Sequence, residues 1–141
     1  MNEYQIIVSD DVSAGDLLVI ENGLNRFNDQ HTGVNDRMPL SVVIKDPATG
    51  ETLGGILGRS SLGLLFIDLV YLPSALRGKQ LGSELLRRFE NEGRKRGCLS
   101  AVLYTISFQA PEFYRKHGWQ EFGRIDCAPE GTSRIFMTKT L

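Results

Sequence analysis

The chain has 141 residues; 41% of them are hydrophobic, 23% are charged, and the formal net charge is −1. A chain of this length is expected to form a single domain, residues 1–141, with one sizeable core. The near-neutral charge argues against nucleic acid as a partner, because nucleic-acid-binding domains are usually basic. Two cysteines are too few for a disulfide scaffold or a zinc cluster, so we expect no metal. We find no secretory signal and no apolar run of about 20 residues, which favours a cytoplasmic protein without a membrane partner.

The first part of the chain predicts a strand, a helix and a loop. The stretch Tyr4–Val8 is apolar enough for a strand. Ser13 can cap a helix. This helix carries apolar residues at roughly helical spacing: Leu17, Leu18, Ile20, Leu24 and Phe27. Gly23 favours a bend within it, and the polar stretch 28–37 predicts a loop.

The middle of the chain predicts three strands. Leu40–Lys45 and Thr52–Arg59 flank a turn that contains both proline and glycine, the two residue types that set turn geometry. The pair Gly54–Gly55 inside the second strand indicates a bulge or a close approach of another backbone segment. The apolar run Leu64–Leu72 is the third strand.

A second helix and three further strands follow. The stretch Ser83–Arg96 is amphipathic and predicts a helix. Its polar side chains are expected in solvent: Glu84, Arg87, Arg88, Glu90, Arg94 and Lys95. Cys98–Ile106 predicts a strand, Ala110–Lys116 a short helix, and 119–125 with 133–139 an antiparallel pair. This order predicts an α/β (α+β) fold with a mixed sheet and helices on both faces.

The short segment Arg77–Gly82 lies between the apolar strand and the amphipathic helix. A glycine-bearing turn at a helix start presents free backbone N–H groups and a partial positive charge, and both favour phosphate. The P-loop pattern is absent, and so is the glycine pair of a dinucleotide fingerprint. Two interpretations remain on these residues alone: a diphosphate cradle, in which Arg77 and Lys79 add charge, or an ordinary surface loop.

A second cluster, Ser107–Trp119, follows the next strand. Together the two regions resemble the GNAT superfamily of acyl-coenzyme A-dependent N-acetyltransferases, and in particular its small bacterial members. Arg77 and Gly82 match the ends of the family's first motif, in which Gln80 occupies the usual inner glycine. The second motif is matched by five residues: Ala110, Phe113, Tyr114, Gly118 and Trp119. Ser107 stands where asparagine is common.

The resemblance implies a mostly antiparallel sheet with one splayed parallel strand pair, and acetyl-coenzyme A as cofactor. It places the pantetheine arm beside the strand that precedes the cradle and the diphosphate in the cradle itself. The implied cofactor-binding residues are Val70, Tyr71, Leu72, Arg77, Gly78, Lys79, Gln80, Leu81, Gly82, Ser83, Ser107, Ala110 and Phe113. The family's usual course is direct attack of a neutral amine on the thioester, with coenzyme A as product.

Two residues are candidates for catalysis. The resemblance implies that Tyr114 protonates the leaving thiolate, a form of general acid catalysis. Asp68 is a carboxylate within an apolar strand, where burial would raise its pKa toward that of a useful base. Glu21 and water are alternative bases, and Asp68 has the alternative role of a structural hydrogen-bond acceptor. His117 has no sequence neighbour that suggests a metal site.

The acceptor is not defined by the motifs. A small-molecule amine, a peptide N-terminus and a protein lysine all remain, and succinyl transfer is an alternative reaction. An acyl-coenzyme A-binding or partner-binding module of the same fold is the main alternative from another class. A toxin that acetylates charged tRNA would favour a more basic chain. The oligomeric state stays open, although a homodimer paired through the closing strands is common in the family.

Overall fold

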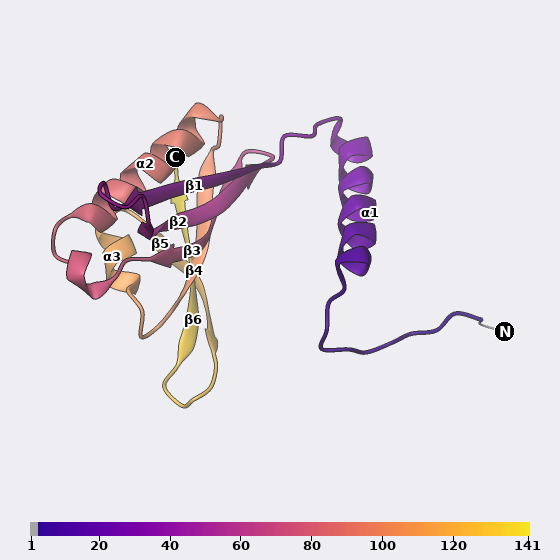
Figure 1. Cartoon of the computed structure of the whole chain (residues 1–141). Helices are drawn as coiled ribbons and strands as arrows, with labels where there is room; N and C mark the ends of the chain where they lie inside the picture. The colour runs from indigo at the N-terminus through magenta and orange to yellow at the C-terminus, as the bar shows by residue number, and fades with distance from the viewer. Residues whose placement is uncertain (1–2) are drawn as a thin grey trace. The chain divides into compact units, whose positions relative to one another are not determined.

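The computed structural model describes residues 3–141, and the chain forms two compact units, Met1–Asn35 and Asp36–Leu141. The first unit contains helix α1, Ala14–Thr32. Figure 1 shows all helices and strands in colours that follow the chain. No helix among residues 3–141 is long and apolar enough to cross a membrane.

Helix α1 begins and ends at the residues that its sequence favours. Ser13 Oγ accepts a hydrogen bond from the backbone N–H of Asp16 at 3.0 Å, as an N-cap does. Gly33 ends the helix with φ 72°, and its N–H donates to the Asp29 carbonyl at 2.8 Å. The helix is not broken at Gly23, because one helical glycine costs only about 1 kcal/mol.

Two expectations for the first unit are wrong. Residues 28–32 are helical, since the stop signal is Gly33 and not the preceding polar residues. Tyr4–Val8 forms no strand, and its side chains are exposed. A strand requires a paired neighbour, and none pairs with these residues. None of the residues of α1 is buried either.

The second unit is one six-stranded sheet with two α-helices. Its elements are β1 Met38–Lys45, β2 Thr52–Ser61, β3 Leu64–Tyr71, η1 Ser74–Leu76, α2 Leu81–Lys95, β4 Ser100–Ile106, α3 Pro111–Lys116, β5 Gln120–Asp126 and β6 Ser133–Thr140. The strand order is β1-β2-β3-β4-β6-β5. Every neighbouring pair is antiparallel except β3 and β4.

The parallel pair β3–β4 is short. Leu64–Phe66 pairs with Ser100–Val102, and beyond Phe66 the two strands are no longer partners. The parallel direction brings the carboxyl ends of both strands to the same end of the sheet. The mixed, mostly antiparallel sheet and its splayed parallel pair confirm the predicted fold class.

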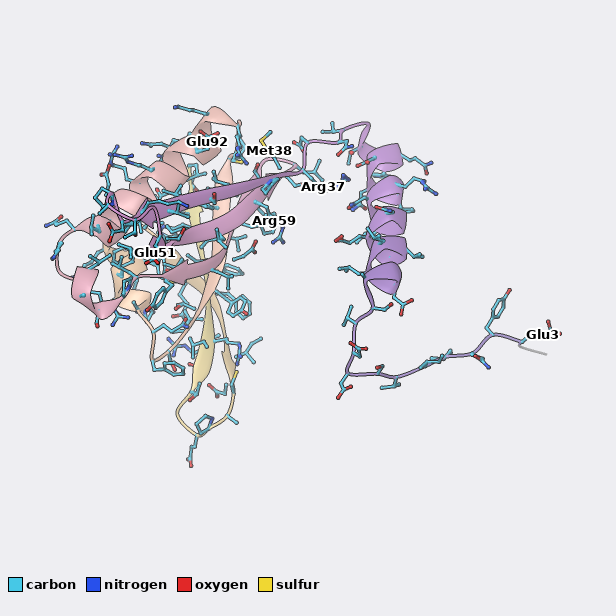
Figure 2. All side chains as sticks on the ribbon, viewed as in Figure 1. Glu3, Arg37, Met38, Glu51, Arg59 and Glu92 are labelled. Carbon is cyan, nitrogen blue, oxygen red and sulfur yellow. The ribbon has the colours of Figure 1, made fainter. Side chains whose placement is uncertain are left out.

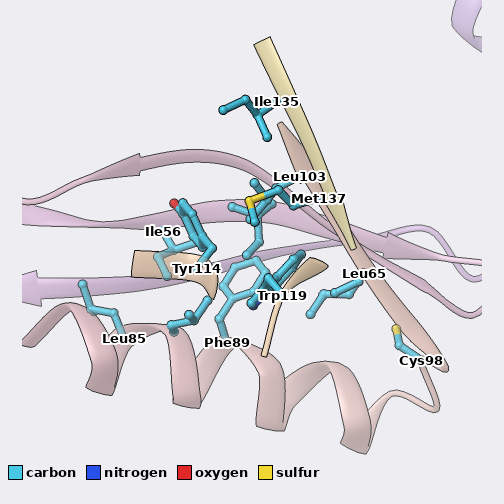
Figure 3. Close-up of a cluster of buried hydrophobic side chains, with 13 residues drawn as sticks. Ile56, Leu65, Leu85, Phe89, Cys98, Leu103, Tyr114, Trp119, Ile135 and Met137 are labelled. Atoms are coloured by element: carbon cyan, nitrogen blue, oxygen red, sulfur yellow. The ribbon is translucent and has the colours of Figure 1, made fainter. Parts of the chain in front are cut away.

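The core lies between one face of the sheet and the helices α2 and α3. Among residues 36–141 both α-helices therefore cover the same face, and the expected helices on both faces are not found in this unit. Leu85 and Phe89 project from α2 into a cluster that includes Leu65 of β3 and Tyr114 of α3, as Figure 3 shows. Leu86 of α2 belongs to the same cluster. In β2, β4 and β6 buried residues alternate with more exposed ones, which is the period-two pattern of a sheet with one buried face. Buried Cys98 belongs to the same cluster, as expected of a small core residue.

The glycines of β2 allow neighbouring segments to approach closely. A Cβ on Gly54 would lie 2.6 Å from the Tyr71 carbonyl oxygen, so the predicted close approach is confirmed. The register irregularity between β2 and β3 lies between Leu57 and Gly58. A Cβ on Gly58 would lie 1.9 Å from the Phe66 carbonyl oxygen and 2.8 Å from the Phe89 ring. These glycines allow β2 to pack closely against β3, the strand that leads into the candidate site.

Candidate active site

Both sequence motifs lie at the open end of the splayed strands. β3 leads through residues 72–80 into α2, and β4 leads through residues 107–110 into α3. Ligands of sheets with parallel strands usually bind beyond the carboxyl ends of those strands, where loops and helix starts converge. The topology therefore brings the two motifs to one site, although about thirty residues separate them along the chain.

The loop before α2 has the backbone conformation of an anion cradle. Gly78 has φ 76°, and Gln80, the N-cap of α2, has φ 65°. A left-handed φ is easy for glycine and costly for other residues, which explains why the family usually has glycine at the position of Gln80. Gln80 keeps this conformation, and its side chain makes no capping hydrogen bond. The first N–H groups of α2 have no partner within the helix and remain available to a ligand.

Arg77 has a structural contact in addition to its expected charge role. Its Nε donates to the Leu72 carbonyl oxygen at 2.9 Å, which ties the loop to the end of β3. Val70 and Tyr71 are exposed at this end of the strand, and Lys79 is exposed in the loop. Arg77 therefore stabilises the loop through its hydrogen bond to Leu72, whereas the Lys79 side chain is exposed to solvent.

Gly82, in the first turn of α2, lies against α3. A Cβ at this position would meet the Phe113 ring at 3.4 Å. In the same turn, Ser83 Oγ lies 3.0 Å from Nε2 of His117, which follows the end of α3. The His117 ring also contacts Phe113, with 4.9 Å between ring centroids. The sequence did not mark His117 as functional, because its partner is far away in the chain.

Tyr114 of α3 is 7% exposed, and its ring packs edge-on against Phe113 and Trp119. Burial raises the pKa of its phenol to about 12. Among residues 3–141 no buried side-chain oxygen or nitrogen lacks a hydrogen-bond partner. No partner is found for the Tyr114 hydroxyl, so this oxygen must reach solvent while the ring is buried. A buried ring with an accessible hydroxyl is compatible with the proton-donor role expected of Tyr114.

Asp68 has a different environment from the one expected. Its Oδ1 accepts from Arg59 Nη1 at 2.6 Å, and the two side chains are 44% and 53% exposed. The premise that Asp68 is buried is therefore wrong, because its carboxylate pairs with Arg59 of β2 and both side chains are about half exposed. Figure 2 labels Arg59 on the ribbon. The Arg59 guanidinium also lies 4.1 Å from the centre of the Phe66 ring.

Ser107 and Ala110 lie in the loop between β4 and α3. Ser107 Oγ accepts from the backbone N–H of Ser133 at 3.0 Å, and the Ser107 N–H donates to the Ser133 carbonyl at 2.8 Å. This serine therefore fastens the loop to β6. Ala110 is the N-cap of α3 and has no side chain that could cap the helix.

Glu90 corrects the prediction that the polar positions of α2 are solvated. It is 4% exposed, and its carboxylate accepts from Lys139 Nζ at 2.6 Å and from Trp119 Nε1 at 3.2 Å. A buried carboxylate is tolerated only when it is paired and hydrogen-bonded. The helical pattern could not show this, because both partners come from later parts of the chain: Trp119 directly precedes β5 and Lys139 lies in β6.

The chain belongs to the acetyltransferase (GNAT) family, whose family model matches residues 19–119. The predicted membership is thereby confirmed, and with it the class of enzyme.

Relatives and solved structures agree with this assignment. An acetyltransferase of Agrobacterium fabrum is 29% identical over 133 residues, 94% of this chain and 96% of that protein. The blasticidin-S acetyltransferase of Streptomyces morookaense is 34% identical over 93 residues, 65% of this chain and 68% of that protein. A solved structure described as an acetyltransferase from Agrobacterium tumefaciens has 28% identity and a TM-score of 0.91, with 98% of this chain and 100% of that chain covered. An aminoglycoside 6′-N-acetyltransferase solved with coenzyme A shares the fold at 19% identity and a TM-score of 0.60, over 80% of this chain and 77% of that chain.

Proposed function

We propose that this acetyltransferase transfers the acetyl group of acetyl-coenzyme A to a primary amine of a small molecule or peptide. In this proposal the reaction takes place in a ternary complex of enzyme, cofactor and amine. Residues 1–141 act together as one N-acetyltransferase domain. The observation that carries the proposal is the opened β3–β4 pair, from whose carboxyl ends both motif loops depart. The related blasticidin-S acetyltransferase supports a small-molecule acceptor. The coenzyme A complex of a protein with the same fold supports the cofactor.

The residues of the open end fit a coenzyme A thioester. A left-handed loop, a helix start with free N–H groups and the side chains of Arg77 and Lys79 suit a diphosphate. Beyond Phe66, the edge of β3 that β4 leaves free can bond an amide-containing arm in the manner of a strand. In this proposal Val70 and Leu72 hold the arm, and a backbone N–H near Tyr71 polarises the thioester carbonyl.

Bound acetyl-coenzyme A supplies an activated acetyl thioester. The amine nitrogen forms the new bond to the acetyl carbon while the carbon–sulfur bond breaks. Tyr114 gives its phenolic proton to the leaving sulfur and recovers one from solvent, which its open hydroxyl can reach. The proton lost by the amine goes to Asp68 or to water; Asp68 is the candidate because it lies on β3, two residues before Val70.

The experiment that tests this function is thiol release from acetyl-coenzyme A in the presence of a panel of amines. The panel should include polyamines, amino acids, peptide N-termini and aminoglycosides. We expect amine-dependent release of one free thiol per acetylated product, identified by mass. Cofactor binding without turnover on any amine would instead favour an acyl-coenzyme A-binding module, and turnover only with succinyl-coenzyme A would replace the acyl donor.

A further inference from the structure

One contact joins the proposed cofactor loop to the helix of the proposed general acid. Ser83 Oγ lies 3.0 Å from His117 Nε2, although the two residues are 34 positions apart. Ser83 belongs to the first turn of α2, and His117 is the C-cap of α3. The pair is partly buried, so water competes with this hydrogen bond only partially.

The His117 ring is held in place independently of any ligand. The imidazole packs against the Phe113 ring, and the His117 backbone carbonyl accepts from Lys139 Nζ at 2.7 Å. The same ammonium pairs with buried Glu90 at 2.6 Å. Because the ring packs against a neighbour and the backbone is bonded to β6, little ordering is needed when a ligand binds, which is the condition for an effective supporting residue.

The chemistry of the pair depends on which atom carries the hydrogen. A serine hydroxyl has one hydrogen to donate and two lone pairs that accept. If His117 Nε2 carries a hydrogen, it donates to Ser83, and the single hydrogen of Ser83 is free for another acceptor. If Nε2 lacks a hydrogen, Ser83 must donate to it and then presents only lone pairs to its surroundings. An anion beside Ser83 therefore favours the first arrangement.

The space for such an anion lies beside the contact. A cavity of about 380 Å³ runs along α2, and Gln80, Ser83 and His117 line the part of it near the helix start. The helix dipole favours negative charge at that end. The rest of the lining mixes the basic side chains of Arg87, Arg94 and Lys139 with the carboxylates of Glu84 and Glu90. Arg87 is turned toward Glu84, with Nη2 2.6 Å from the Glu84 carboxylate, so its charge is partly balanced.

We propose that His117 is a positioning residue that donates to Ser83 and thereby turns the Ser83 hydroxyl toward the diphosphate of coenzyme A. The inference rests on the proposed function, since it assumes that the diphosphate binds at the start of α2. The proposal gives His117, which lies outside the cradle, a role in cofactor recognition. It also links α2 and α3 through the hydrogen bond between His117 and Ser83.

The test is calorimetric titration of acetyl-coenzyme A and of dephospho-coenzyme A into the wild type and four variants. Ser83→Ala removes the hydroxyl. His117→Met keeps an apolar side chain of similar length without a donor, whereas His117→Gln restores an N–H. The double variant combines Ser83→Ala with His117→Met. Thermal melting of each variant verifies that it is folded.

We expect Ser83→Ala and His117→Met each to weaken binding of both ligands about tenfold, the effect of one hydrogen bond to a charged group. The double variant should bind about as weakly as either single variant, because both changes break the same hydrogen bond. His117→Gln should stay within about threefold of the wild type.

Three results would overturn the inference. Additive losses in the double variant would show that the two residues act separately. Equal weakness of His117→Gln and His117→Met would show that the ring acts by packing. A loss for acetyl-coenzyme A but not for dephospho-coenzyme A would place the contact at the 3′-phosphate. Failure of the wild type to bind either ligand is distinguishable, because it contradicts the proposed function itself.

Discussion

The two faces of the sheet in residues 36–141 differ in how their side chains are held. On one face, Leu65, Leu103 and Met137 are buried beneath α2 and α3. On the other face, Tyr104 and Asp68 are exposed, and the contacts run between neighbouring strands, as between Tyr104 and Phe136. The two motifs that identify the family lie on the buried face, because they form the loops and helices that cover it.

From this difference we infer that the two faces of the sheet serve different functions. Tyr114 and the cradle at the start of α2 are fixed by packing and by hydrogen bonds between helices. Arg59 and Asp68 are fixed mainly by each other. A cofactor that all family members use requires a fixed site, whereas acceptors that differ among members require side chains that can vary without loss of the fold. We therefore expect cofactor binding to depend on the helix-covered face and acceptor choice on the exposed face.

The largest effect is expected from Tyr114→Phe. Removal of the phenolic proton donor should lower kcat about 10²–10⁴-fold, the usual range for general acid–base catalysis. Because the ring and its packing remain, the Kd for acetyl-coenzyme A should change less than about twofold. Steady-state kinetics and calorimetry on the same preparation measure both quantities. Unchanged turnover would remove Tyr114 from the mechanism.

A second effect of Tyr114 concerns stability at high pH. The pKa of this phenol rises from its ordinary value of 10.0 to about 12 in the folded protein because the ring is buried. The folded state therefore keeps the proton when the unfolded chain loses it. The resulting contribution is fully present below pH 10 and is lost as the pH rises to about 12, a change of about 3 kcal/mol.

Denaturant unfolding between pH 8 and about 11.5 measures this loss. Tyr114→Phe should remove the corresponding part of the alkaline decline, whereas Tyr104→Phe, at an exposed position, should leave it in place. The same decline in the wild type and in Tyr114→Phe would show that burial of this phenol does not control alkaline stability.

The smallest effect is expected on the exposed face. Asp68→Asn should lower kcat/KM about tenfold, because water can replace an exposed base in part. Cofactor affinity should stay unchanged. Arg59→Met, which removes the ion-pair partner of Asp68 and the contact with the Phe66 ring, should keep kcat/KM within about threefold of the wild type. An unchanged kcat/KM in Asp68→Asn, or an equal loss in both variants, would assign Asp68 a structural role beside Arg59.

The helix-covered face could be predicted from the sequence because its signals are local. Apolar periodicity located α2 and the strands, and the glycine-bearing segment Arg77–Gly82 predicted the loop and helix start between β3 and α2. The family resemblance also led to the splayed strand pair, which no local pattern contains.

The remaining features depend on contacts between distant residues. Glu90 is buried because Lys139 and Trp119 reach it from other elements. Asp68 is paired because the register of β2 and β3 brings Arg59 within reach. Such pairings follow from tertiary structure, so hydrophobic periodicity predicts the wrong environment for both carboxylates.

The most direct test of the central claim is calorimetric titration of acetyl-coenzyme A into the wild type, Gly82→Ala and Gly82→Trp. Alanine adds only a Cβ at 3.4 Å from the Phe113 ring and is common in the family's motif, so we expect binding within about threefold of the wild type. Tryptophan should fill the cradle and abolish binding while the protein remains folded by thermal melting. Wild-type affinity in Gly82→Trp, or no binding by the wild type at millimolar cofactor, would contradict the account.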